Sequence, residues 1–233
     1  MLPVKLLRDN VRRARERIAV AAQRVGREPD EVTLLAATKT RSVEEIAAVI
    51  EAGVEEVGEN YVQEARAKFV HLGPRVRWHM IGHLQRNKVK AALEIFEVIQ
   101  SVDSLRLARE ISKRAQRQGR EVPILIEVKT GGEETKFGVE PAAAAELVEQ
   151  IAPLEGLRVE GLMTMPPPCA DPEEVRPFFR QLRQLAEEIE KLALPRVRMW
   201  HLSMGMSQDF EVAIEEGATI VRLGTVLFGP RQE

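Results

Sequence analysis

The stretch from Val32 to Gly58, VTLLAATKTRSVEEIAAVIEAGVEEVG, contains a complete strand–helix–strand unit. Its first part, Val32–Thr38, is a short apolar run that indicates a buried strand. The serine that opens the segment Ser42–Ala52 stands at capping-box spacing from Glu45, which predicts a helix over this segment. A second apolar run, Val54–Gly58, follows directly. A strand, a helix and another strand in this order are typical of a parallel sheet.

The same alternation continues to the end of the chain. A helix that Gly26 ends precedes the first strand, and amphipathic segments or helical turns separate the later runs. Six further apolar runs lie near Arg77–Gly82, Phe96–Val102, Pro123–Val128, Leu157–Met163, Arg198–Ser203 and Thr219–Gly224. Eight such units without a break predict an α/β fold, a single (β/α)8 TIM-type barrel with an extra N-terminal helix, in one domain over residues 1–233. A doubly wound open sheet is the alternative, but the first strand–helix turn, ATKTRS, lacks a G-x-G-x-x-G pattern.

Composition and charge exclude several classes of protein. The chain has 233 residues, of which 44% are apolar and 30% are charged, and its net charge is only −2. Such a charge gives no reason to expect nucleic-acid binding, and no window approaches the roughly 20 apolar residues of a membrane span. The single cysteine, Cys169, rules out an intramolecular disulfide and a cysteine-based zinc site. The N-terminal segment lacks the apolar core of a secretion signal, so we expect a cytoplasmic protein.

The barrel prediction directs attention to the carboxyl ends of the strands, where barrel active sites lie. Lys39 ends the first strand and Asn60 follows the second. The Lys39 side chain either extends along the surface into solvent, or is a desolvated amine able to form a Schiff base with an aldehyde. Asn60 either caps the next helix or belongs to a site at the barrel mouth.

The histidines indicate a functional site less clearly than these strand-end residues do. His79 lies in the third strand and is expected to be a hydrogen-bonded residue of the barrel interior. No combination of histidines and a carboxylate has the spacing of a metal site, so no metal is predicted. The sequence assigns no role to His83, or to Lys136 in the polar, glycine-rich loop after the fifth strand.

The seventh strand ends in HLSMGMS, from His201 to Ser207. The small residues Ser203, Gly205 and Ser207 would let an anion approach backbone N–H groups at the start of the next helix. Alternatively, Ser207 is only the cap of that helix.

The eighth strand carries an arginine, Arg222, on the same face as Gly224. A buried arginine is costly unless it is paired, and Glu59 is a candidate partner. Gly224 and Thr225 stand where barrels bind phosphate. Together with Lys39, these residues suggest a phosphorylated aldehyde or ketone as ligand.

Taken together, these segments resemble the pyridoxal 5′-phosphate (PLP) homeostasis protein family, also called the PROSC or YggS-like family. The resemblance covers nearly the whole chain. Its segments are ATKTRSVEEI around Lys39, GENYVQEA from Gly58, WHMIGHLQRNKVK from Trp78, SVDSL from Ser101, TKFG from Thr135, and HLSMGMSQDFEVAIEEGATIVRLGTVLFGPR from His201. The resemblance implies a barrel like the N-terminal domain of alanine racemase.

The resemblance also implies a role for each matching residue. Lys39 would hold PLP as an internal aldimine with Asn60 near its amine, and Arg222 would lie by the pyridine nitrogen. The phosphate-binding turns would contain Ser203, Met204, Gly205, Ser207, Gly224 and Thr225. An arginine, which is always charged, donates to an unprotonated ring nitrogen, and such a ring is a poorer electron sink. The implied function is therefore to hold and buffer PLP without robust turnover, as a monomer that can deliver PLP to PLP-dependent apo-enzymes.

Two enzymatic alternatives stay open at this point. An amino-acid racemase needs a second acid or base, which alanine racemases take from a tyrosine of a separate β domain. This chain is too short for such a domain, and its only tyrosine is Tyr61. The other alternative uses Lys39 as an aldolase lysine that acts on a sugar phosphate without PLP.

Overall fold

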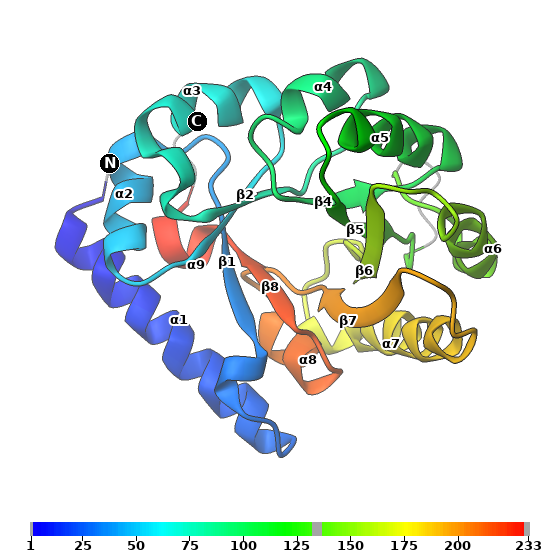
Figure 1. The fold of residues 1–233 in the computed structure, drawn as a ribbon. Helices are drawn as coiled ribbons and strands as arrows, with labels where there is room; N and C mark the ends of the chain where they lie inside the picture. The colour runs from blue at the N-terminus through cyan, green and yellow to red at the C-terminus, as the bar shows by residue number, and fades with distance from the viewer. Residues whose placement is uncertain (1, 132–136, 231–233) are drawn as a thin grey trace.

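Eight parallel strands close into a barrel in a computed structural model that describes residues 2–131 and 137–230 (Figure 1). Each strand pairs with the next, and β1 also pairs with β8, so the sheet has no edge. The predicted (β/α)8 barrel is therefore confirmed, and the open-sheet alternative is wrong. The strands are β1 (Thr33–Ala37), β2 (Glu56–Glu59), β3 (Arg77–Met80), β4 (Val98–Val102), β5 (Val122–Glu127), β6 (Leu157–Met163), β7 (Val197–Ser203) and β8 (Ile220–Leu223).

Helices surround the barrel because each strand is followed by a segment with one apolar face. The predicted capping box is confirmed: the Ser42 hydroxyl accepts the Glu45 backbone N–H, and the Glu45 carboxylate accepts that of Ser42. The helices are α1 (Val4–Arg24), α2 (Val43–Glu51), α3 (Val62–Leu72), α4 (Val89–Ala92), α5 (Leu105–Arg117), α6 (Pro141–Ile151), α7 (Arg176–Lys191), α8 (Phe210–Glu215) and α9 (Thr225–Phe228), with short 3-10 turns at Pro29–Glu31, Gly73–Arg75, Arg86–Lys88 and Pro172–Val175.

The extra N-terminal helix, α1, lies outside the barrel and packs against α2, α8 and α9 (Figure 1). It turns Leu7, Val11, Ala14 and Ile18 inward, and all four are buried. These residues recur at intervals of three or four, so the apolar stripe that predicted the helix is also its packing face.

The hydrophobic core has two parts. The larger part fills the space between the strands and the surrounding helices. The smaller part lies inside the barrel and consists of Leu35, Ile81, Leu125, Met163 and Ile220. Burial of each such side chain contributes about 1.5–3 kcal/mol to folding. On one side of this apolar cluster, Leu125 and Ile220 meet the polar side chains of Glu56, His79 and His201.

Within residues 2–131 and 137–230, no helix combines the length and the apolar character of a membrane span.

Candidate functional site

A cavity of about 450 Å³ opens at the carboxyl ends of the strands. This volume falls within the range of about 300–1,000 Å³ that is usual for small-molecule sites. Six of the residues that the sequence singles out line it together: Lys39, Asn60, Ser207, Arg222, Gly224 and Thr225. They come from the ends of β1, β2, β7 and β8, which lie far apart in the sequence and meet only because the sheet closes.

The backbone on both sides of Lys39 is held by a buried ion cluster that the sequence analysis did not identify. Lys68 of α3 donates from Nζ to the Thr38 carbonyl at 2.7 Å and to the carboxylates of Glu59 at 2.6 Å and Glu64 at 2.7 Å. The Thr38 hydroxyl donates to the same Glu59 oxygen at 2.6 Å. These bonds fix the residue directly before Lys39 against α3.

The residue after Lys39 is held by the same cluster. Thr40 has a φ of 65°, an uncommon backbone conformation for a residue with a side chain, and its N–H donates to Glu64. Strained backbone of this kind persists only where the surrounding contacts enforce it. The conformation of the chain at Lys39 is therefore determined by α3 as well as by β1.

One sequence signal could have revealed this cluster. Lys68 lies on the buried face of α3 with Val62, Ala65 and Leu72, at helical spacing. A lysine at an apolar position of this kind needs an anionic partner.

Arg222 is 4% exposed and is held by the ends of β6 and β7. Its Nη1 donates to the carbonyl of Ser203 at 2.7 Å and to the Ser203 hydroxyl at 2.6 Å, and its Nη2 donates to the Thr164 carbonyl at 2.7 Å. Burial lowers the pKa of Arg222 to about 10, while Glu127 and Asp209 oppose this effect. The guanidinium therefore stays charged at neutral pH and presents a cation to the cavity.

The predicted pairing of Arg222 with Glu59 is wrong. A Cβ at Gly58 would meet Leu35 and Ile81, which are residues of the barrel interior, so Gly58 faces inward. Side chains alternate along a strand, and Glu59 therefore points outward to Lys68 of α3.

Ser207 joins the two turns that follow β7 and β8. Its hydroxyl oxygen accepts the backbone N–H groups of Gly224 at 3.3 Å and of Val226 at 3.2 Å. Helix α8 instead begins after Asp209, so the alternative of Ser207 as its cap is wrong. Because the Ser207 oxygen accepts both N–H groups, the hydrogen of its hydroxyl is the donor that this corner of the cavity wall can offer to an anion.

Three predicted residues lie behind this wall and do not line the cavity. Ser203 is buried against Arg222, and Met204 is buried in the core between strands and helices. Gly205 has a φ of 92°, and a Cβ there would lie 2.6 Å from the Ala213 side chain. The close approach of α8 therefore requires glycine at this position.

Asn60 does not cap the following helix. Helix α3 begins after Tyr61, and Asn60 lines the cavity with Lys39. The cavity is also lined by Met165, Pro167, Pro168 and Cys169, which the sequence pattern did not connect with the site.

The other sequence candidates are separate from this cavity. The prediction for His79 is confirmed, since it is 1% exposed and its Nδ1 lies 2.8 Å from Gln100 Nε2. His83 stacks on Phe137 and lies 3.5 Å from Asp103. Lys136 lies outside the described residues. Among the residues that are described, no three histidine, cysteine or acidic side chains form a group that could hold a metal.

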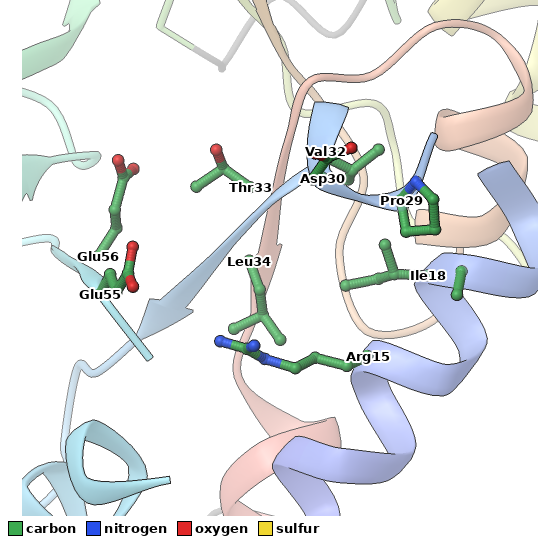
Figure 2. Close-up of a pocket in the computed structure, with 10 residues that line it drawn as sticks. Arg15, Ile18, Pro29, Asp30, Val32, Thr33, Leu34, Glu55 and Glu56 are labelled. Atoms are coloured by element: carbon green, nitrogen blue, oxygen red, sulfur yellow. The ribbon is translucent and has the colours of Figure 1, made fainter. Parts of the chain in front are cut away.

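A second hollow of about 520 Å³ lies at the opposite, amino-terminal end of the strands (Figure 2). Arg15 of α1, Thr33 of β1, and Glu55 and Glu56 at the start of β2 line it. It lacks the combination of a lysine, a buried arginine and glycine-rich turns that distinguishes the cavity at the carboxyl ends.

Comparison with known proteins gives consistent matches over almost the whole chain. Residues 7–232 match the family described as "Alanine racemase, N-terminal domain". The chain is 48% identical to the pyridoxal phosphate homeostasis protein of Aquifex aeolicus, covering 96% of this chain and 98% of that protein. It is 39% identical to the protein of the same name from Escherichia coli K12, covering 95% of each. These relatives are named for homeostasis and not for an enzymatic reaction.

Solved structures also superpose on this chain over most of its length. A protein of unknown function from Bifidobacterium adolescentis superposes with a TM-score of 0.93 at 41% identity, covering 97% of this chain and 95% of that one. PipY of Synechococcus elongatus with PLP bound superposes with a TM-score of 0.79 at 36% identity, covering 92% of this chain and 99% of that one. Alanine racemase of Clostridium difficile shares the fold, with a TM-score of 0.75 at 16% identity, and this chain covers 58% of it.

Proposed function

Because this chain belongs to the pyridoxal phosphate homeostasis protein family, we propose that it binds PLP in the cavity at the carboxyl ends of its strands. The observation that carries this proposal is that one cavity is lined by Lys39, Arg222 and the turn at Gly224. PLP has an aldehyde, a ring nitrogen and a phosphate, and the cavity offers an amine, a cationic donor and the Ser207 hydroxyl beside the turn that contains Gly224 and Thr225. The residues present therefore fit the cofactor in chemical type.

Each residue has a defined task in this proposal. The Lys39 amine is the group that would react with the aldehyde, and Asn60 would contact that amine. Ser207, Gly224 and Thr225 would bind the phosphate, while Ser203, Met204 and Gly205 would support the wall from behind. Arg222 would donate to the ring nitrogen.

The chemistry of Arg222 supports a binding function over turnover. PLP promotes reactions of amino acids by withdrawing electrons into its ring, most strongly when the ring nitrogen is protonated. Arg222 can only donate hydrogen bonds, and therefore needs that nitrogen as an acceptor without a proton. We propose that the protein holds and buffers PLP, and delivers it to PLP-dependent apo-enzymes.

The racemase and aldolase alternatives receive no support from a specific observation. Tyr61 is 64% exposed and does not line the cavity, so it cannot act as a second acid or base there. The aldolase alternative requires a protein without PLP, whereas a relative with this fold, PipY, has been solved with PLP bound.

An absorption spectrum before and after borohydride treatment tests the proposal. We expect the purified protein, or the protein after incubation with PLP, to be yellow, and the reduced adduct to map to Lys39. Lys39→Ala should lose the covalent adduct, whereas Lys90→Ala, a change at an exposed lysine of α4, should retain it. A colourless protein that PLP does not convert would overturn the proposal, and an adduct retained in Lys39→Ala would overturn the assignment of Lys39.

The proposal includes one barrel domain over residues 1–233 that acts as a monomer in the cytoplasm. Light scattering on the PLP-loaded protein should give a mass near 26.2 kDa. Transfer of PLP is tested by mixing the loaded protein with a PLP-free enzyme and following the recovery of that enzyme's activity. Recovery no faster than with the same free PLP concentration would contradict delivery.

A further inference from the structure

A chain of polar side chains, buried except for Glu56 at its end, runs from Arg222 toward the amino-terminal end of the barrel. Arg222 Nη1 lies 2.6 Å from the Ser203 hydroxyl, which lies 2.6 Å from Gln100 Oε1. Gln100 Nε2 lies 2.8 Å from His79 Nδ1, and His79 Nε2 lies 3.0 Å from Glu56 Oε2. Nothing in the sequence pattern points to Gln100 or Glu56.

Simple chemistry fixes the direction of the three hydrogen bonds between Arg222 and His79. Arg222 can only donate, so the Ser203 oxygen accepts and its hydrogen points to Gln100 Oε1. The opposite orientation of the Gln100 amide would place two donors on the Ser203 oxygen and leave the hydroxyl hydrogen without this acceptor. Gln100 therefore donates from Nε2 to His79 Nδ1, and the proton of the neutral imidazole must lie on Nε2.

The chain ends on a carboxylate. Burial alone would raise the pKa of Glu56, but the contact with His79 and the nearby Arg77 and His201 together lower it. His79 Nε2 and Glu56 Oε2 lie 3.0 Å apart, but the contact does not have the geometry of a hydrogen bond, and neither atom has a hydrogen-bond partner among residues 2–131 and 137–230. Glu56 also lines the hollow at the amino-terminal end of the barrel (Figure 2).

The three hydrogen bonds thus run in one direction from a cation, and the His79 ring that receives the last of them lies against the Glu56 carboxylate. Hydrogen bonds arranged in this way polarise one another, and the low dielectric of the interior strengthens them. The Ser203 hydroxyl is held with its lone pair toward Arg222, because its hydrogen is engaged by Gln100.

We propose that Gln100 and His79 are positioning residues that hold the Arg222 guanidinium where the ring nitrogen of PLP binds. This inference rests on the proposed function. It assigns the interior polar residues of β3 and β4 to the cofactor site, although neither residue lines the cavity.

The first test is the tautomer of His79, read from long-range ¹H–¹⁵N NMR correlations of the protein without PLP. We expect the Nε2–H tautomer in the wild type. The Nδ1–H tautomer would reverse the direction of the chain and overturn the inference, whether or not the protein binds PLP.

The second test is PLP titration of Gln100→Leu, which removes the link to Ser203. We expect the affinity for PLP to fall about tenfold, which is the effect of weakening one hydrogen bond to a charged group. The pH profile of the bound cofactor's absorption should also shift, because the donor at the ring nitrogen is displaced. Ser101→Ala is the matched control, since Ser101 is buried on the same strand and its hydroxyl has no partner in the described part of the chain.

A pair of changes at His79 tests the inference independently of whether Gln100→Leu folds. His79→Gln supplies an amide oxygen to accept from Gln100 and an amide N–H for Glu56, so it should bind PLP nearly as well as the wild type. His79→Leu should bind about tenfold more weakly, because it ends the chain at Gln100.

The outcomes separate the inference from the function on which it rests. A wild type that does not bind PLP would overturn the proposed function. A wild type that binds PLP, together with unchanged affinity and absorption in both leucine variants, would overturn the positioning role alone.

Discussion

The Lys68 ammonium donates a hydrogen bond of 2.7 Å to the backbone carbonyl of Thr38. This bond joins α3 to the residue directly before Lys39, and the same nitrogen also contacts the buried carboxylate of Glu59. Lys39, the lysine proposed to react with PLP, is therefore held in place by a second lysine, Lys68. The Lys68 residue is only 6% exposed and does not line the cavity.

Replacing this second lysine should destabilise the protein strongly. Lys68→Met keeps the length of the side chain but leaves Glu59 as a buried, uncompensated carboxylate. Removal of one partner of a buried ion pair costs about 3–5 kcal/mol, so we expect the free energy of unfolding to fall by about 3 kcal/mol. Urea unfolding at pH 7 measures this loss. Lys90→Met, at an exposed position, should change it by less than about 0.5 kcal/mol. Equal losses in the two variants would contradict a structural role for Lys68.

The strand pattern made most of the fold predictable. Each of the eight apolar runs became a strand, because a run of that length between turn residues has few other ways to bury its side chains. Closure of the barrel then followed from the number of units, and the carboxyl ends of the strands brought Lys39, Asn60 and Arg222 to one cavity.

Side-chain pairs between different strands of the barrel could not be predicted from the same pattern. Glu59 and Arg222 are both charged residues near strand ends, yet one faces outward and the other inward. The bulges that shift the register along β4, β5, β6 and β7 leave no signal in the local pattern. The bond from Ser203 to Gln100 spans 103 residues and depends on that register.

Two glycines beside the cavity should respond in opposite ways to an added methyl group. A Cβ at Gly224 would meet only Ala37, at 3.6 Å or more, so Gly224→Ala should leave the stability nearly unchanged. Because Gly224 lines the cavity, the methyl group should weaken PLP binding. Gly205→Ala should instead lower the stability. The added Cβ would clash with Ala213, and the φ of 92° disfavours any residue with a side chain, so we expect the free energy of unfolding to fall by more than about 1 kcal/mol.

Titration with PLP and with pyridoxal, combined with thermal unfolding, separates these effects. If the turn at Gly224 binds the phosphate, Gly224→Ala should lower the affinity for PLP more than that for pyridoxal. Equal losses for the two ligands would argue against phosphate binding at this turn. A large drop in melting temperature for Gly224→Ala would show that packing, and not the ligand, requires glycine there.

Glu127 should make the stability of the protein without PLP fall as the pH rises. Glu127 is 4% exposed, and its Oε2 has no hydrogen-bond partner among the described residues. Burial raises the pKa of Glu127 to about 7, with the nearby Asp103 adding to this effect and Arg222 opposing it. The folded protein then binds this proton more tightly than the unfolded chain, so stability is lost as the pH rises from about 5 to 8.

Glu127→Gln cannot ionise, and we expect it to be more stable than the wild type at pH 8, by at most about 3 kcal/mol, with little difference near pH 4.5. Urea unfolding at the two pH values measures the gap, with Glu121→Gln, an exposed change before the same strand, as the control. A gap of the same size at both pH values would show that Glu127 does not ionise in this range.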